Sequence, residues 1–383
     1  MRLGRVVGAT IGITAAVAAA GAASLGWIVA RTLTAPVSER DFDLRVRGIE
    51  NDGDQTWIVL DRTSDTAAAG IYNLWFEQGG WAQLGPEIRD HGPDRIARAI
   101  TGASDGLEPK SGDRVSWSGI YYATPTDAGL EAREITIQTP AGACPAWRVD
   151  GSSTWAIHIH GLGGTRAGTL RGVQVATELG YTSLAVSYRN DGEGPTVRTG
   201  RSTLGWTEVD DVEAAIHYAV RHGAERIVLF GWSMGGSIAL QLALQPHLKD
   251  HIAGLVLDSP VLDWRRAIRA NCKRAGLPEF AEQLAMPFLE CLPLARPLGL
   301  PCTVAIDAMS YRHSAARLAT PTLIIHGAGD LSVPIDAAVE MRDMHPDLVE
   351  LHQFGSAHTV SWNADAARWR GVTKGWVRQS ITS

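Results

Sequence analysis

The stretch Ile227-Val228-Leu229-Phe230-Gly231-Trp232-Ser233-Met234-Gly235-Gly236 joins an apolar run to a G-x-S-x-G pattern. Four apolar residues in succession are typical of a buried parallel strand, and residues 237–244 favour a helix. A serine between two such elements predicts the sharp strand-to-helix turn called a nucleophile elbow, in which Gly231 and Gly235 leave room for neighbouring backbone. We therefore predict that Ser233 stands above the sheet edge as a nucleophile.

A nucleophilic serine needs a base and an acid that orients the base, and in this architecture the chain order is serine, acid, histidine. An apolar run that begins at Pro321 leads into a loop that contains Asp330. This loop lies at the carboxyl edge of the predicted sheet, where the sites of open α/β folds form. The last predicted strand, Val349 to Phe354, leads into a loop that contains His358. We predict Asp330 as the acid and His358 as the general base.

Other residues compete for these two roles. Asp258 follows the apolar run 254–257 and is a second candidate acid, whereas Asp330 sits in a Gly-Asp turn where an aspartate often caps its own backbone. His352 lies inside the last strand, and His326 lies in the strand before the acid loop. We prefer Asp330 and His358 because each sits in a loop that directly follows a strand.

An oxyanion hole needs two backbone N–H donors, one after the nucleophile and one from an early strand-to-helix loop. Met234 follows the serine and supplies the first. Residues 155–160 form an apolar strand that enters a glycine-rich loop, so the N–H of Leu162 is the expected second donor. Each donor contributes about 3 kcal/mol of transition-state stabilisation.

The glycine-rich loop does not match a cofactor site. Gly161-x-Gly163 is followed by Arg166 where a dinucleotide fingerprint has its third glycine, and no Walker lysine follows. His158 and His160 alternate on one strand without the further clustered ligands that zinc needs. We expect no cofactor and no metal. A net charge of −6 without a long basic stretch makes nucleic acid an unexpected partner.

Taken together, the loop His160 to Gly164, the elbow Gly231 to Gly236, the pair Gly329-Asp330 and the loop Ser356 to His358 resemble the α/β-hydrolase superfamily over roughly residues 131–383. Within it, the chain is similar to bacterial serine hydrolases described as serine aminopeptidase-like or dipeptidyl-aminopeptidase/acylaminoacyl-peptidase-related. The resemblance implies an α/β-hydrolase fold: a mostly parallel central sheet with helices on both faces and a cap insertion, here at about residues 261–318. It also implies acyl transfer to serine without a cofactor.

The amino terminus predicts a membrane segment within residues 1–35. Arg2 and Arg5 precede 25 uncharged residues, Val6 to Ala30, which end at Arg31. A run of this length can cross a bilayer and exceeds the apolar region of a secretory signal. We expect an uncleaved anchor that holds the catalytic domain outside the cytoplasm, with cleavage near residues 20–23 as the alternative.

Residues 36–130 predict a β-rich extension ahead of the hydrolase domain at 131–383. Short β-rich runs at 42–46, 56–60, 69–76 and 114–122 are broken by glycine-containing turns. Apolar residues of the cap segment are expected either to line an acyl pocket or to seat the cap on the core: Trp264, Phe280, Leu284, Met286, Phe288, Leu289 and Leu292. Four cysteines are compatible both with two disulfides and with separate buried thiols.

These features predict a serine hydrolase that cleaves a carboxylic ester, a thioester or a lipid acyl bond of a small-molecule or lipid-like substrate. A serine peptidase is the alternative, because the same three side chains cleave amides. An aminopeptidase needs carboxylates for the substrate's ammonium group, and Glu279, Glu282 and Glu290 are the clustered acids of the cap. A non-catalytic, membrane-tethered binding or scaffold protein is the alternative of another class.

Overall fold

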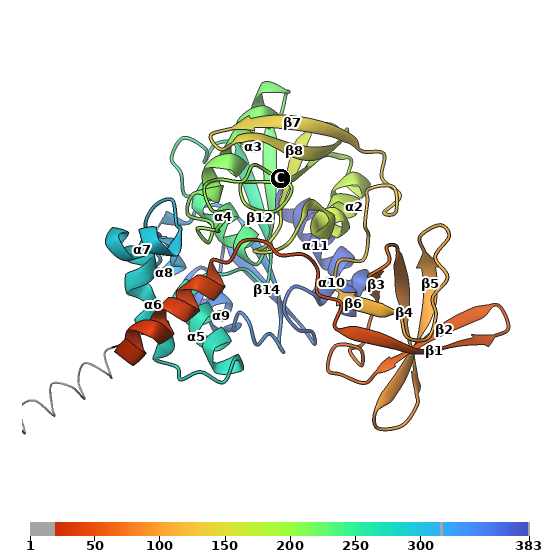
Figure 1. The fold of residues 1–383 in the computed structure, drawn as a ribbon. Helices are drawn as coiled ribbons and strands as arrows, with labels where there is room; N and C mark the ends of the chain where they lie inside the picture. The colour runs from red at the N-terminus through yellow and green to blue at the C-terminus, as the bar shows by residue number, and fades with distance from the viewer. Residues whose placement is uncertain (1–19, 315–316, 382–383) are drawn as a thin grey trace, which may run out of the picture.

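The computed structural model describes residues 20–314 and 317–381. Figure 1 shows a small β-barrel beside a larger domain built on a central sheet, with a group of helices at the far side from the barrel. The larger domain contains the predicted elbow, acid loop and histidine loop, so its sheet decides where the candidate site lies.

The barrel is built from six strands that close in the order β1-β2-β5-β4-β3-β6. The strands are β1 (Leu44–Asp52), β2 (Gln55–Asp61), β3 (Tyr72–Phe76), β4 (Trp81–Asp90), β5 (Arg95–Ala103) and β6 (Arg114–Ser118). The β-rich runs of the sequence indicated four of them. The other two, β4 and β5, carry Gly85-Pro86 and the fully buried Arg98 inside the strands, which interrupts an apolar pattern. The two terminal nitrogens of the Arg98 guanidinium donate to backbone carbonyls, among them that of Gly85 at 2.9 Å.

The central sheet has eight strands in the order β14-β13-β12-β11-β9-β10-β8-β7, and only β8 runs antiparallel to its neighbours. The strands are β7 (Arg133–Thr139), β8 (Gly142–Val149), β9 (Ser152–Ile159), β10 (Tyr181–Val186), β11 (Arg226–Trp232), β12 (Ile252–Asp258), β13 (Thr322–Gly327) and β14 (Val349–Phe354). The apolar runs expected to be strands at residues 155–160, 227–230, 254–257 and 349–354, and the run that begins at Pro321, each correspond to one of the six parallel strands β9 to β14. The mostly parallel sheet is therefore confirmed.

Helices cover both faces of this sheet. One face packs against α2 (Leu170–Glu178), α10 (Ser361–Ala364) and α11 (Ala366–Ser380). The other face packs against α3 (Glu208–Arg221), α4 (Met234–Ala243) and α9 (Asp336–Met344). A short 3-10 helix, η1 (Arg166–Thr169), precedes α2. Because each face of the sheet is buried, its strands read as continuous apolar runs in the sequence.

The cap lies between β12 and β13, as predicted. It consists of α5 (Trp264–Arg274), α6 (Ala281–Glu290), α7 (Leu292–Leu298), η2 (Asp307–Met309) and α8 (Tyr311–Ser314). Trp264, Met286 and Leu289 are buried in the main hydrophobic core, so they seat the cap on the sheet. All four cysteines are free thiols. The division of the chain at residues 35/36 and 130/131, and the cap limits at 261 and 318, stay predictions.

The membrane anchor predicted for Val6 to Ala30 is wrong. Residues 6–19 lie outside the described part of the chain, but residues 20–33 form a helix that packs on the protein itself. Val29 and Ala30 are buried in the core, and the Trp27 ring meets the Phe288 ring of α6 edge to face at 5.7 Å. Across residues 20–314 and 317–381, no helix combines the length and the apolar character needed to span a bilayer. The predicted membrane anchoring fails with it.

Candidate active site

Ser233 occupies a strained turn between β11 and α4. Its φ of 52° and ψ of −115° lie where a non-glycine residue costs about 1–3 kcal/mol. Backbone hydrogen bonds hold it there: the Ser233 N–H donates to the Asp258 carbonyl, and the Val261 N–H donates to the Ser233 carbonyl, each at 3.0 Å. A Cβ at Gly235 would lie 2.1 Å from the Ile159 carbonyl oxygen, so the elbow requires glycine there.

The structure brings Ser233, His358 and Asp330 together from three separate segments. The Oγ of Ser233 lies 2.9 Å from the Nε2 of His358. The Nδ1 of the same ring lies 2.6 Å from the Oδ2 of Asp330. If the Nδ1–H donates to the carboxylate, Nε2 is left with a lone pair that accepts the serine proton. This connectivity is the one that a general base needs.

The Asp330 carboxylate is buried and heavily hydrogen-bonded. Its Oδ1 accepts the backbone N–H groups of Ser332 at 2.9 Å and Val333 at 2.8 Å. Burial alone raises the pKa of Asp330, but hydrogen bonds with His326 and His358 and the Val333 N–H hold this pKa well below its usual range. A carboxylate that stays ionised can orient an imidazole and stabilise the imidazolium.

The competing residues have other partners. The Oδ2 of Asp258 accepts the indole N–H of Trp369 at 2.9 Å, and burial raises the pKa of Asp258. His326 is buried, and its Nε2 donates to the Val333 carbonyl at 2.9 Å. His352 pairs with the neighbouring Glu350 on the last strand. The side chains of these three residues form no hydrogen bond with the Ser233 hydroxyl, which pairs with His358.

The two expected oxyanion donors flank the serine. Met234 is the first residue of α4, and Leu162 lies in the loop after β9. This loop passes directly against the elbow, since a Cβ at Gly161 would lie 3.0 Å from the Ser233 Cβ. The loop is anchored by the buried His160, whose Nε2 lies 3.0 Å from the Oδ2 of Asp191. The helix N-terminus at Met234 adds a positive potential where an oxyanion would form.

A cavity of about 330 Å³ opens at Ser233 and His358. Its walls include residues that the sequence did not single out, from the segment after the barrel, from α2 and from the histidine loop: Gly119, Ile120, Arg171 and Val360. These residues come from segments far apart in the chain, and no local pattern marks them. The sequence therefore indicates the candidate reacting groups but not the walls around them.

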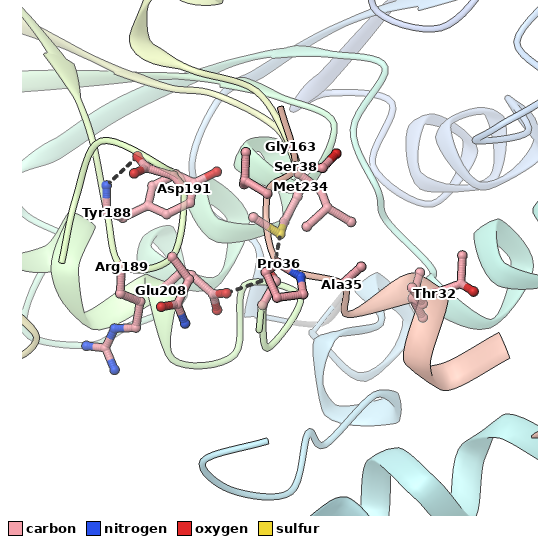
Figure 2. Close-up of a pocket in the computed structure, with 15 residues that line it drawn as sticks. Thr32, Ala35, Pro36, Ser38, Gly163, Tyr188, Arg189, Asp191, Glu208 and Met234 are labelled. Carbon is pink, nitrogen blue, oxygen red and sulfur yellow. Dashed lines mark hydrogen bonds between the residues drawn. The ribbon is translucent and has the colours of Figure 1, made fainter. Parts of the chain in front are cut away.

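A second, more polar cavity of about 200 Å³ shares Leu162 and Gly163 with the first. Figure 2 shows Asp191 and Glu208 on one side of it and Thr32, Ala35 and Pro36 from the N-terminal segment on the other. The N-terminal segment thus continues from its helix to the neighbourhood of the glycine-rich loop.

One group among the described residues has the geometry of a metal site. The side chains of Glu213 and His217 on α3 and of His247 after α4 place their ligand atoms within 4.8 Å of one another. Glu213 already forms ion pairs with both histidines, at 3.4 Å and 2.9 Å. His158 and His160, the histidines considered from the sequence, are not part of this group.

Comparisons with known proteins agree with the fold. Residues 157–288 match the family model "alpha/beta hydrolase fold", and residues 45–118 match the model "Domain of unknown function (DUF8805)", which spans the barrel. No curated protein matches the chain. Two crystal forms of the Pyrococcus furiosus esterase Pf2001 are similar, each with a TM-score of 0.53. They are 20% and 21% identical and cover 67% of this chain and 96% and 94% of the esterase.

The predicted α/β-hydrolase fold is confirmed by these matches. The likeness to the esterase at such low identity concerns the fold alone. The narrower resemblance to serine aminopeptidase-like proteins finds no support among the matches.

Proposed function

We propose that the chain is a serine hydrolase that cleaves a carboxylic ester or thioester of a small-molecule acyl substrate. Its support is the continuous hydrogen-bonded path from the Ser233 Oγ through His358 to Asp330, at a cavity open to a ligand. The similarity to an esterase agrees with this substrate class.

The proposed reaction has two halves. The Ser233 Oγ attacks the acyl carbonyl carbon while His358 Nε2 takes the serine proton, and the Leu162 and Met234 N–H groups donate to the developing oxyanion. The C–O or C–S bond to the leaving group then breaks as His358 returns the proton to that group. Water, deprotonated by His358, attacks the acyl-enzyme, and the acid leaves as Ser233 regains its proton.

An aminopeptidase is the weaker candidate, because two of the three clustered acids of the cap, Glu282 and Glu290, are already paired with arginines. Glu282 is buried, and its carboxylate receives Arg265 at 3.1 Å and Arg269 at 3.3 Å. Glu290 also pairs with Arg265, at 3.5 Å. Carboxylates held by arginines in this way are not free to bind a substrate's ammonium group.

The test is labelling of the full chain with a short-chain fluorophosphonate, followed by assays on acyl esters, thioesters and aminoacyl amides. We expect Ser233→Ala to abolish labelling and Asp330→Asn to lower kcat by about 10⁴. The matched variant Asp258→Asn, which changes the competing acid, should keep most of the wild-type kcat. If folded wild-type protein neither reacts with the probe nor hydrolyses any substrate, the non-catalytic binding alternative replaces the proposal.

A further inference from the structure

A third cavity, of about 610 Å³, lies between the N-terminal helix (residues 20–33) and α5 of the cap. This volume is within the range of ligand pockets, about 300–1,000 Å³. Most of the lining is apolar and comes from the two helices and the turn after α5: Ile28, Val29, Leu33, Ile268, Cys272 and Leu277. The sequence suggested seven cap residues as candidates to line an acyl pocket, and none of them borders this cavity.

Two polar side chains of the lining, Asn271 and Arg274, form hydrogen bonds within the protein. The Asn271 Nδ2 donates to the carbonyls of Ala267 and Ser332, each at 2.8 Å, and its Oδ1 accepts the Arg274 Nη2 at 2.9 Å. Burial raises the pKa of the Cys272 thiol, which keeps the thiol neutral. No carboxylate lines the cavity among the residues that the structure describes. Such a cavity favours an apolar ligand over a charged one.

The apolar cavity and the cavity at Ser233 share one lining residue, Leu162. This residue lines both the cavity at Ser233 and the apolar cavity, and its side chain is 38% exposed although it is large and apolar. Its N–H is also a proposed donor to the oxyanion. An acyl group whose carbonyl oxygen meets this N–H therefore lies against a residue that also lines the apolar cavity.

We propose that this cavity binds the acyl chain of the substrate, so that the preferred substrates are esters or thioesters of aliphatic carboxylic acids. The N-terminal helix then forms one wall of the acyl site, with Ile28 and Ala275 at positions that set the acceptable chain length. This inference rests on the proposed function and names the substrate class of the same site.

The first experiment measures kcat/KM of the full chain on p-nitrophenyl acetate, butanoate, hexanoate and octanoate. Burial of one methylene corresponds to a gain of about fourfold in kcat/KM, so kcat/KM should rise steeply along the series.

Ala275 is exposed, so Ala275→Trp can fill the cavity without disturbing the core. The kcat/KM of this variant should fall about tenfold or more on p-nitrophenyl octanoate and change less than about twofold on the acetate. Ala308→Trp places the same side chain on an exposed cap position that lines none of the three cavities and should match wild type.

A second pair of variants tests the wall formed by the N-terminal helix. Ile28 is 55% exposed, so Ile28→Glu should fold while it places a carboxylate on the cavity wall. We expect Ile28→Glu to lose octanoate activity and keep acetate activity, and the apolar control Ile28→Leu to keep both.

The outcomes separate this inference from the proposed function. Short-chain fluorophosphonate labelling of Ser233 and acetate hydrolysis report the proposed function alone. If both are present but the chain-length series is flat, or if Ala275→Trp and Ile28→Glu leave it unchanged, the acyl site is overturned while the hydrolase stands. Loss of labelling and of acetate hydrolysis in folded wild-type protein overturns both.

Discussion

At the scale of single residues, the buried pair of His160 and Asp191 connects the glycine-rich loop to the loop after β10. Asp191 also accepts the backbone N–H groups of Tyr188 at 2.9 Å and Gly194 at 2.6 Å. Burial raises the pKa of Asp191, but the hydrogen bond and charge of His160 and these backbone donors lower it to about 2. The ionised carboxylate therefore stabilises the folded loop that carries Leu162.

This shift predicts a measurable pH dependence of stability. Because the folded pKa of Asp191 lies below the unfolded value, its contribution is complete above about pH 5 and is lost as the pH falls toward 2. Between pH 5 and pH 3 the contribution of Asp191 to the free energy of unfolding falls by about 1 kcal/mol. Urea unfolding at the two pH values should show a decrease for wild type that is larger, by this amount, than for Asp191→Asn. Equal decreases would contradict the assignment.

The residues expected at the reacting centre could be read from the sequence because each follows a strand directly. Ser233, Asp330 and His358 follow β11, β13 and β14, and parallel strands bring their carboxyl ends to one sheet edge. Their roles stay predictions until they are tested. Asp191 was not predicted as the partner of His160, since the two are joined only by the packing of one loop on another.

At the scale of elements, the N-terminal helix shows that composition alone does not distinguish a membrane segment from a helix that packs on the protein. An apolar segment rich in alanine and glycine is compatible with a lipid environment and with a protein groove, because both exclude water. Which of the two surroundings the helix takes depends on how closely its surface fits a protein neighbour. Here the fit is close, because a Cβ at Gly26 would lie 2.1 Å from the Leu284 carbonyl oxygen of α6. The close approach of the two helices is a property of the folded pair, so the sequence of one helix did not reveal it.

Substitution at two glycines of this helix tests the packing. Gly26→Ala forces the helix away from α6, whereas a Cβ at Gly21 meets nothing within 4 Å. Alanine favours a helix over glycine by about 1 kcal/mol, so Gly21→Ala should keep or raise the melting temperature. Gly26→Ala should lower it and expose the segment before β1 to limited proteolysis. If both variants resist the protease equally, the helix does not depend on this contact.

At the scale of the whole molecule, Asn363 joins the barrel side of the chain to the hydrolase domain. Its Nδ2 donates to the carbonyls of Ile71 at 2.8 Å and Gly119 at 3.0 Å, and its Oδ1 accepts Arg171 of α2 at 3.1 Å. The sequence indicated a β-rich extension but not where it docks, because docking depends on contacts between Asn363 and three distant segments. Asn363 follows the histidine loop by a few residues, and Gly119 lines the cavity at Ser233, so the docking contact and the candidate site are neighbours.

Asn363→Ala should therefore affect both stability and activity. Asn363 is almost fully buried, and the change removes three hydrogen bonds, with an expected loss of about 3 kcal/mol in the free energy of unfolding. A shift of the wall at Gly119 and of the histidine loop should lower kcat/KM by about tenfold or more, even at temperatures where the variant is fully folded.

Asn51→Ala, which changes an exposed asparagine of the barrel, is the matched control and should alter neither the free energy of unfolding nor kcat/KM. Urea unfolding and ester hydrolysis on the same preparations separate the two effects. Destabilisation with unchanged kcat/KM would mean that the barrel supports the fold without shaping the site, whereas a fall in both would make the barrel part of the substrate pocket.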